Sequence, residues 1–331
     1  MGTPVSTRPG GPKQGAKGTP GGTVSRRPRT LMSMRGRRTA LPWLLLAPPL
    51  FVIGALLLFP LGRIVWLSTR EYGLRELVSG RSEFIGFDNY VDLLTDPYLW
   101  NVVLLNTVVF AVVAVVTTVV LGTLVALLLV NLRVVPRVIV ISCIMVAWAM
   151  PVVSGTYVWI WIFDVDQGVV AQALMNLGVI GQEGHNWFAD RFWFYAIVTL
   201  NIVHSGFPFV AVTVLAGLLT VPKELQEAAL IDGAGPWKRF WHVTFPVLRP
   251  VFAVVTILST IWDFKVFAQI YLMPGGDVSG SDVLNLGVWA YISSFGNNDY
   301  GTGSAVAVIL TLLLLAITIV YLRSLFKDDE L

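Results

Sequence analysis

Six long apolar runs constrain the fold of this 331-residue chain more than any other feature of its sequence. Each run is long enough to cross the hydrocarbon core of a bilayer as a helix, which takes about 20 residues. Because lipid offers the backbone no hydrogen-bond partners, we expect each run to form one uninterrupted helix. The sequence therefore predicts an all-α, polytopic membrane protein with six transmembrane helices. The runs are 41–67, 102–130, 138–163, 192–219, 251–272 and 305–322.

The basic residues are distributed unevenly, and this predicts how the chain lies in a membrane. Residues 1–40 contain nine Lys and Arg but no Asp or Glu. The connection after the second run carries Arg133 and Arg137, whereas the connection before it holds three basic and six acidic residues. Because basic loops stay in the cytoplasm, we expect both termini and the 221–249 segment to be cytoplasmic.

The same composition predicts three parts of the chain. Residues 1–40 are rich in Gly, Pro, Ser and Thr, cannot bury a core, and should form a disordered basic cytoplasmic tail. A nucleic-acid-binding arm is the less favoured interpretation of this tail. The transmembrane domain occupies 41–326, and 327–331 form a short cytoplasmic tail. Tryptophans near the ends of the runs, Trp159, Trp161 and Trp193, are predicted to anchor the helices at the membrane interface.

A polar, helix-forming stretch separates the fourth and fifth runs. Gly233 should stop a first helix, because glycine readily adopts the left-handed conformation that ends helices. A second helix is predicted to start near Pro236 and to end at Pro246, after which Pro250 opens the fifth span. Two uses fit such a cytosolic helix–turn–helix: an amphipathic element resting on lipid headgroups, or a docking element for a cytosolic protein.

This stretch also carries a spaced pattern, E-A-A-x-x-D-G-A followed by one F and two P, over more than twenty residues. The pattern resembles the cytoplasmic motif of ABC-importer permeases. The resemblance implies coupling helices that sit in a groove of the ATPase subunit and transmit ATP-driven motion to the spans. The matching residues are Glu227, Ala228, Ala229, Asp232, Gly233, Ala234, Phe240, Pro246 and Pro250.

The resemblance extends over about residues 41–326 and points to the carbohydrate-uptake branch, similar to the maltose and glycerol-3-phosphate type. It implies import of a sugar or oligosaccharide through a pore of which this chain forms half. The implied partners are a second, non-identical permease subunit, an ABC ATPase dimer, an extracytoplasmic sugar-binding protein and membrane lipid. The implied location is the inner or plasma membrane of a bacterium. His204 and the pair Met273–Pro274 depart from the usual residues, which leaves the identity of the sugar open.

The sequence contains no ATP-binding motif and no recognisable catalytic motif. The phosphate-binding pattern G-x-x-x-x-G-K-[ST] does not occur. There is no Cys/His cluster for a metal, and Cys143 is the only cysteine. We therefore expect a transporter subunit that is not an enzyme and binds no cofactor, with ATP and magnesium bound by the partner ATPase.

Asp263 and Lys265 place charges in the middle of the fifth run. Charges in a membrane normally face a cavity or a partner, because burying them alone is costly. Residues two apart on a helix point in different directions, so we do not expect these two to pair. Two interpretations stay open: they line a substrate pathway together with Trp262 and Phe267, or they contact another helix.

Asn201 and His204 in the fourth run leave a similar choice open, between a satisfied interior histidine and a substrate contact. The alternative function is an ion-coupled secondary sugar carrier, since proton relays use intramembrane Asp, Glu and His. The thin set of such residues and the lack of a visible internal repeat count against it. A non-transporting membrane scaffold is a third hypothesis.

Overall fold

The computed structural model describes residues 42, 45–181, 184–274 and 282–327. The predicted basic tail 1–40, its boundary at 40/41 and the last four residues lie outside this part. The chain forms two compact units, Met1–Leu58 and Phe59–Leu331. The described residues of the first unit are helical and end in the π-helical turn η1 (Gly54–Leu58). The second unit holds the elements from Phe59 onwards that are described below; the span Leu45–Leu67 crosses the boundary between the two units in the sequence.

Five helices in the described residues are long and apolar enough to cross a membrane. A bent pair of shorter helices, Val134–Trp148 and Val152–Ile162, supplies a sixth span if the pair counts as one. The other spans are Leu45–Leu67, Leu99–Val130, Arg191–Leu218, Pro236–Leu272 and Tyr300–Arg323.

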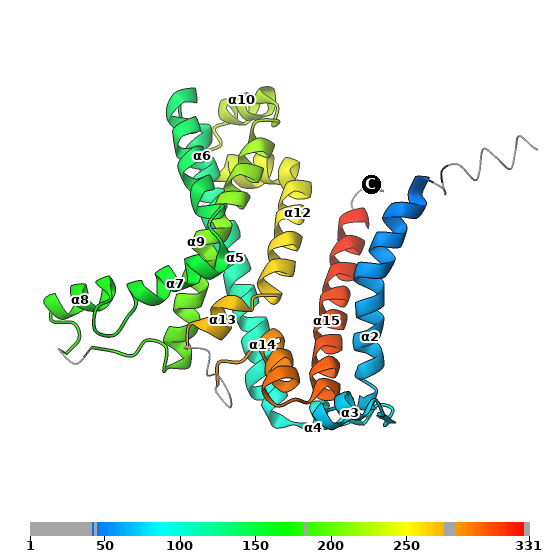
Figure 1. The fold of residues 1–331 in the computed structure, drawn as a ribbon. Coiled ribbons are helices and arrows are strands. Elements are labelled where there is room, and N and C mark those ends of the chain that lie inside the picture. The colour runs from blue at the N-terminus through cyan, green and yellow to red at the C-terminus, as the bar shows by residue number, and fades with distance from the viewer. Residues whose placement is uncertain (1–41, 43–44, 182–183, 275–281, 328–331) are drawn as a thin grey trace, which may run out of the picture. The chain divides into compact units, whose positions relative to one another are not determined.

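The elements of the second unit follow one another mostly as helices (Figure 1). A two-stranded antiparallel sheet, in which Arg70 pairs with Phe84 and Glu71 with Glu83, departs from the predicted all-α class. The first elements are α2 (Phe59–Leu67), β1 (Arg70–Glu71), α3 (Leu74–Ser79), β2 (Glu83–Phe84), α4 (Asp88–Thr95), η2 (Leu99–Leu104) and α5 (Leu105–Val130). Then come α6 (Val134–Trp148), α7 (Val152–Ile162), α8 (Val169–Asn176), α9 (Arg191–Leu218), α10 (Lys223–Ile231), α11 (Pro236–Arg239) and η3 (Phe240–Thr244). The last are α12 (Phe245–Phe264), α13 (Ala268–Leu272), α14 (Leu286–Tyr291), η4 (Ile292–Gly296) and α15 (Tyr300–Lys327).

Glycines let the central spans α5, α9 and α12 pack closely. A Cβ atom added to Gly122 on α5 would lie 2.6 Å from the side chain of Val210 on α9. A Cβ at Gly217 on α9 would lie 2.9 Å from Leu248 on α12. In lipid, where the hydrophobic effect does not drive helices together, small residues permit the van der Waals contacts that do.

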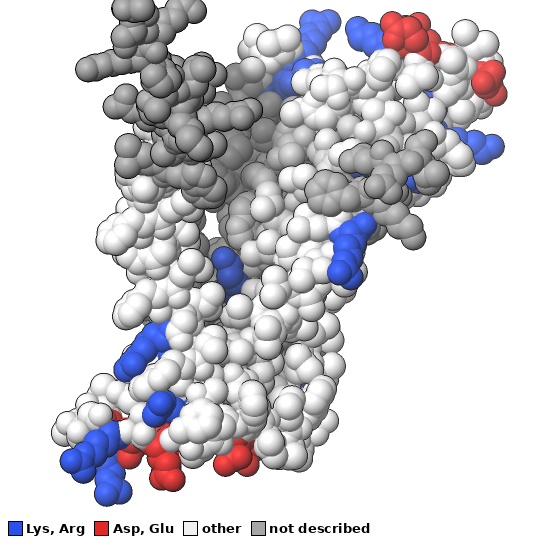
Figure 2. All heavy atoms as spheres, turned by 90° about the vertical axis from the view of Figure 1, so that its right-hand side faces the viewer, with Lys and Arg blue, Asp and Glu red and all other residues white. Residues whose placement is uncertain are grey.

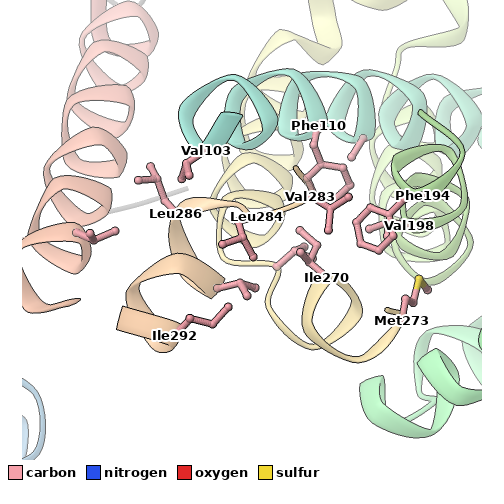
Figure 3. Close-up of a cluster of buried hydrophobic side chains, with 14 of the residues drawn as sticks. Val103, Phe110, Phe194, Val198, Ile270, Met273, Val283, Leu284, Leu286 and Ile292 are labelled. Carbon is pink, nitrogen blue, oxygen red and sulfur yellow. The ribbon is translucent and has the colours of Figure 1, made fainter. Parts of the chain in front are cut away.

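A hydrophobic cluster joins α5 and α9 to the chain around α13 and α14 (Figure 3). Phe194 and Ile270 are completely or almost completely buried in it, and so is Leu286 at the start of α14. The cluster therefore fixes the short helices against the long spans. Its labelled members are Val103, Phe110, Phe194, Val198, Ile270, Met273, Val283, Leu284, Leu286 and Ile292.

The prediction of one uninterrupted helix at 138–163 was wrong. The helix stops after Trp148, and α7 starts again at Val152 with its axis turned by 92°. Pro151 is the N-cap of α7. A proline disfavours helical conformation in the residue before it and has no N–H to continue the hydrogen-bond ladder, so the chain breaks there.

The predicted stop at Pro246 was also wrong. Helical structure continues from α11 through the π-helical turn η3 into α12, which contains Pro246 in its first turn and Pro250 in its interior. Local π-helical adjustment can re-satisfy backbone groups that prolines leave unpaired. The predicted run 251–272 is in turn interrupted, because α12 ends at Phe264 and α13 starts at Ala268.

Candidate functional site

The helix–turn–helix that carries the sequence motif is built around Gly233. Gly233 has a φ angle of +76°, which only glycine adopts without strain. Its N–H donates to the carbonyl of Leu230 at 3.1 Å, and the N–H of Ala234 donates to Ala229 at 2.9 Å. These two bonds satisfy the last carbonyls of α10 in the pattern of a Schellman motif. The predicted glycine stop and the predicted start of the second helix at Pro236 are confirmed.

Apolar side chains lie exposed around this turn. Ile231 is 86% exposed and Trp237 is 73% exposed. Charged residues of α10 and α11, including Glu227 and Lys238, are exposed beside them. Figure 2 shows both charge signs together at the upper edge of the drawn face, the level at which α10 lies in Figure 1. Exposed apolar patches rimmed by polar residues mark interaction surfaces.

Aromatic rings connect the helix–turn–helix to the fifth span. The ring of Trp241 lies 5.0 Å from that of Phe245, and Phe245 lies 5.1 Å from Phe252 within α12. Phe240 contacts both Trp241 and Phe245, at 5.2 and 6.3 Å. Packed rings and continuous helical backbone thus connect α11 to α12.

A cavity of about 450 Å³ lies at two helix breaks. Its walls come from the α6–α7 break, from the middle of α9, and from the break between α12 and α13. Ligand sites in membrane transporters commonly form at such discontinuous helices. All six residues predicted for a substrate pathway line it: Trp262, Asp263, Lys265, Phe267, Asn201 and His204.

Both buried and exposed polar side chains line this cavity. Asp263 is 6% exposed, and its Oδ2 has no hydrogen-bond partner among the described residues. Asn201 and Gln269 are buried as well. Lys265, just past the end of α12, and His204 are exposed. The cavity therefore combines buried acceptors and amides with accessible basic groups.

Aromatic rings also line the cavity, and two of them were not predicted from the sequence. Trp159 was predicted to be an interface anchor, but it is half-buried and lines the cavity with its ring 5.9 Å from His204. Trp148 lines it as well and stacks on Phe209, which contacts Trp262 at 5.1 Å. Hydrophobic periodicity did not reveal these roles, because the cavity forms at a helix break near Pro151 that periodicity does not predict.

This arrangement suits a polar ligand with apolar faces. Aromatic rings can stack on the C–H faces of a sugar, while amide and carboxylate groups bind its hydroxyls. Pockets for small molecules generally combine apolar walls with a few placed polar groups. Among the described residues, no group of three or more His, Cys, Asp or Glu could hold a metal ion.

The family profile of the binding-protein-dependent transport system inner membrane component matches residues 118–327. The chain belongs to this family. The matched region contains the helix–turn–helix and all six cavity residues named above, so the family predicted from the motif is confirmed.

Curated relatives of this inner membrane component align over most of its length. It is 40% identical to the diacetylchitobiose uptake system permease protein DasB of Streptomyces coelicolor, over 97% of each chain. It is 34% identical to the sulfoquinovosyl glycerol transport system permease protein SmoG of Agrobacterium fabrum, over 86% of this chain and 90% of the relative. It is 31% identical to the trehalose/maltose transport system permease protein MalF of Thermococcus litoralis, over 88% and 95%.

A solved structure shares the fold. A chain of a bacterial ABC transporter that imports the acidic polysaccharide alginate matches with a TM-score of 0.72 at 18% identity, covering 87% of this chain and 96% of that one. A chain of a bacterial alginate ABC transporter in complex with an alginate pentasaccharide-bound periplasmic protein also matches with a TM-score of 0.72 at 18% identity.

Proposed function

We propose that this chain is the transmembrane permease subunit of an ATP-binding-cassette importer that moves a sugar or oligosaccharide into the cell. It forms half of the translocation pore and works by alternating access. The observation that carries this proposal is the cavity at the helix breaks, because it gathers aromatic and polar side chains suited to a carbohydrate. The relatives' names support the substrate class, since they transport diacetylchitobiose, trehalose or maltose.

The helix–turn–helix is the proposed contact with a separate ABC ATPase dimer, which binds the ATP and magnesium. Its exposed Ile231 and Trp237 offer apolar area, and Ala228 and Gly233 allow close approach of another backbone. The aromatic contacts at Phe245 would pass its movement to α12. Because α12 ends at the cavity, movement of the coupling helices would change the cavity walls.

The proposed cycle needs partners on both sides of the membrane. Both termini and the coupling helices face the cytoplasm of a bacterium, and an extracytoplasmic binding protein delivers the sugar to the acidic outer loops. A second, non-identical permease completes the pore within the lipid. ATP binding turns the cavity outward and hydrolysis returns it inward, because ligand and nucleotide favour different conformers.

Reconstitution into proteoliposomes tests this function. The chain is combined with its partner permease, ATPase dimer and binding protein, and uptake of radiolabelled diacetylchitobiose, trehalose and maltose is measured with and without ATP. We expect ATP-dependent uptake of at least one of them. Uptake that persists without the ATPase and follows an imposed pH gradient would instead support the ion-coupled carrier. A complex that moves none of the sugars would contradict the substrate class.

A further inference from the structure

A short segment, 282–286, lies across α5 and α9, and side chains of those spans hold it; we call it the strap. Asn106 on α5 donates from Nδ2 to the carbonyls of Asp282 and Leu284, both at 2.8 Å. Tyr195 on α9 donates its hydroxyl to the carbonyl of Val283 at 2.9 Å. Buried polar backbone of an irregular segment needs such partners, so the strap has a defined position.

The anchors of the strap are themselves fixed. Thr107 accepts from the N–H of Leu286 at 2.9 Å and donates to the carbonyl of Val103. Arg191 at the start of α9 donates from Nε to Oδ1 of Asn106 at 2.8 Å. Asn106 and Thr107 are both buried. The strap is thus tied to α5 and α9, two spans that pack against each other.

Asn285 extends from the strap to the break between α12 and α13. Its Nδ2 donates to the carbonyl of Val266 at 2.8 Å, and its Oδ1 accepts from the N–H of Val288 at 2.9 Å. Asn285 is 1% exposed. Val266 belongs to the non-helical segment that lines the cavity. One amide therefore caps α14 and also binds a backbone carbonyl of the cavity wall.

Aromatic contacts reinforce this connection. Tyr291 at the end of α14 packs its ring 5.1 Å from Phe267 and 5.3 Å from Tyr271. Phe267 lines the cavity. Because Asn285 caps the helix that presents Tyr291, it acts on two consecutive wall residues, Val266 by a hydrogen bond and Phe267 through packing.

We propose that Asn285 is a positioning residue of the cavity: it fixes the break between α12 and α13 so that the wall residues 265–269 face the transported molecule. This inference rests on the proposed function. Asn285 does not line the cavity itself, so its effect acts through the Val266 carbonyl. A carbonyl in a helix break has no partner in the helical ladder, and losing a buried hydrogen bond leaves it unsatisfied.

Two variants separate this role from the cap of α14. Asn285→Ser keeps an oxygen that can cap α14, because serine is a favoured N-cap residue. Its side chain is too short to reach the carbonyl of Val266. Asn285→Asp keeps the shape and the cap but replaces the donor facing Val266 with an acceptor. Asn131→Asp is the matched control, because Asn131 donates to Leu127 at the exposed end of α5, away from the cavity.

The readout is the amount of sugar moved per ATP hydrolysed by the complete reconstituted complex, using whichever of diacetylchitobiose, trehalose or maltose the unmodified complex imports. We expect both Asn285 variants to lower this ratio about tenfold, the effect of one lost buried hydrogen bond. ATP hydrolysis stimulated by the binding protein should change less than twofold, roughly as in Asn131→Asp.

Equal ratios in the Asn285 variants and the Asn131 control would overturn the inference. So would a parallel loss of transport, ATP hydrolysis and assembled complex in both Asn285 variants, because that pattern indicates a structural role alone. If the unmodified complex moves none of the sugars, the proposed function fails rather than the role of Asn285.

Discussion

At the scale of single residues, Asp263 is the cavity residue for which the structure gives the most specific prediction, a hydrogen bond to the transported sugar. Its side chain is buried at the end of α12, and one carboxylate oxygen is unpartnered among the described residues. A sugar hydroxyl could donate to that oxygen. Hydrogen bonds to charged groups are worth about 1.5–3 kcal/mol. We therefore expect Asp263→Ala to lower ATP-dependent sugar uptake at least about tenfold.

The control for Asp263 is Asp166→Ala, an exposed aspartate in the loop after α7. Both variants are measured in the reconstituted complex at saturating sugar-loaded binding protein. Unchanged uptake in Asp263→Ala would show that this carboxylate makes no contact with the transported sugar.

Gly233 allows an equally direct comparison with Gly178. Both follow a helix with positive φ angles, +76° and +69°, and a Cβ at either would meet nothing within 4 Å. Alanine in the left-handed conformation costs about 1–2 kcal/mol at each position. We expect similar decreases in thermal stability for Gly233→Ala and Gly178→Ala, but reduced ATP-dependent uptake only for Gly233→Ala. Equal uptake in the two variants would remove the turn from the coupling pathway.

At the level of elements, the sequence predicted where the spans lie better than where they break. Hydrophobic length identifies a helix that can cross a membrane, and it did so for five runs. It does not show whether a proline interrupts the helix. Pro151 breaks its span, whereas Pro246 and Pro250 are accommodated in α12 after the π-helical turn.

The cavity residues were predictable for a related reason. Intramembrane Asp263, Lys265 and His204 stand out because charge is costly in lipid. Trp148 and Trp159 did not, since tryptophan is ordinary at membrane interfaces. Asn285 could not be predicted, because its role depends on contacts between segments far apart in the sequence.

Arg137 stabilises the connection between α5 and α6, a role that is separate from its use in predicting membrane orientation. In the sequence, Arg133 and Arg137 were equivalent as basic residues of one connecting loop. In the structure, Arg137 donates to the carbonyls of Leu129, Val130 and Leu132, each at 2.9 Å. These bonds satisfy carbonyls at the end of α5 and hold the tight connection to α6. A cation at a helix C-terminus is further favoured by the helix dipole.

We expect Arg137→Gln to destabilise the protein by roughly 1.5–3 kcal/mol, the range for hydrogen bonds made by charged groups. Arg133→Gln is the matched control, because Arg133 is exposed. Thermal unfolding in detergent, followed by tryptophan fluorescence, compares the two. Equal midpoints would mean that the three carbonyls find other partners when the guanidinium is removed.

At the scale of the whole molecule, the spans differ greatly in the share of their residues that is buried by the rest of the chain. Half of the most apolar window of Arg191–Leu218 is buried, against 11% for Tyr300–Arg323. α9 is therefore a central helix of the second unit, in contact with α5, α6, α7 and α12. The surfaces left exposed are available to lipid and to the proposed second permease, a division that hydropathy alone cannot resolve.

Assembly provides the final prediction, because a partner that binds only the folded chain stabilises it. At a partner concentration of 100 times the dissociation constant this stabilisation is about 2.7 kcal/mol. If the α10–α11 turn is the docking surface, adding the ATPase dimer should raise the unfolding midpoint of the permease complex. Gly233→Pro should abolish this rise, because proline cannot adopt a φ angle of +76° and cannot donate to Leu230. Gly178→Pro imposes the same change at the end of α8 and should preserve the rise. An equal rise in both variants would place the ATPase contact elsewhere on the chain.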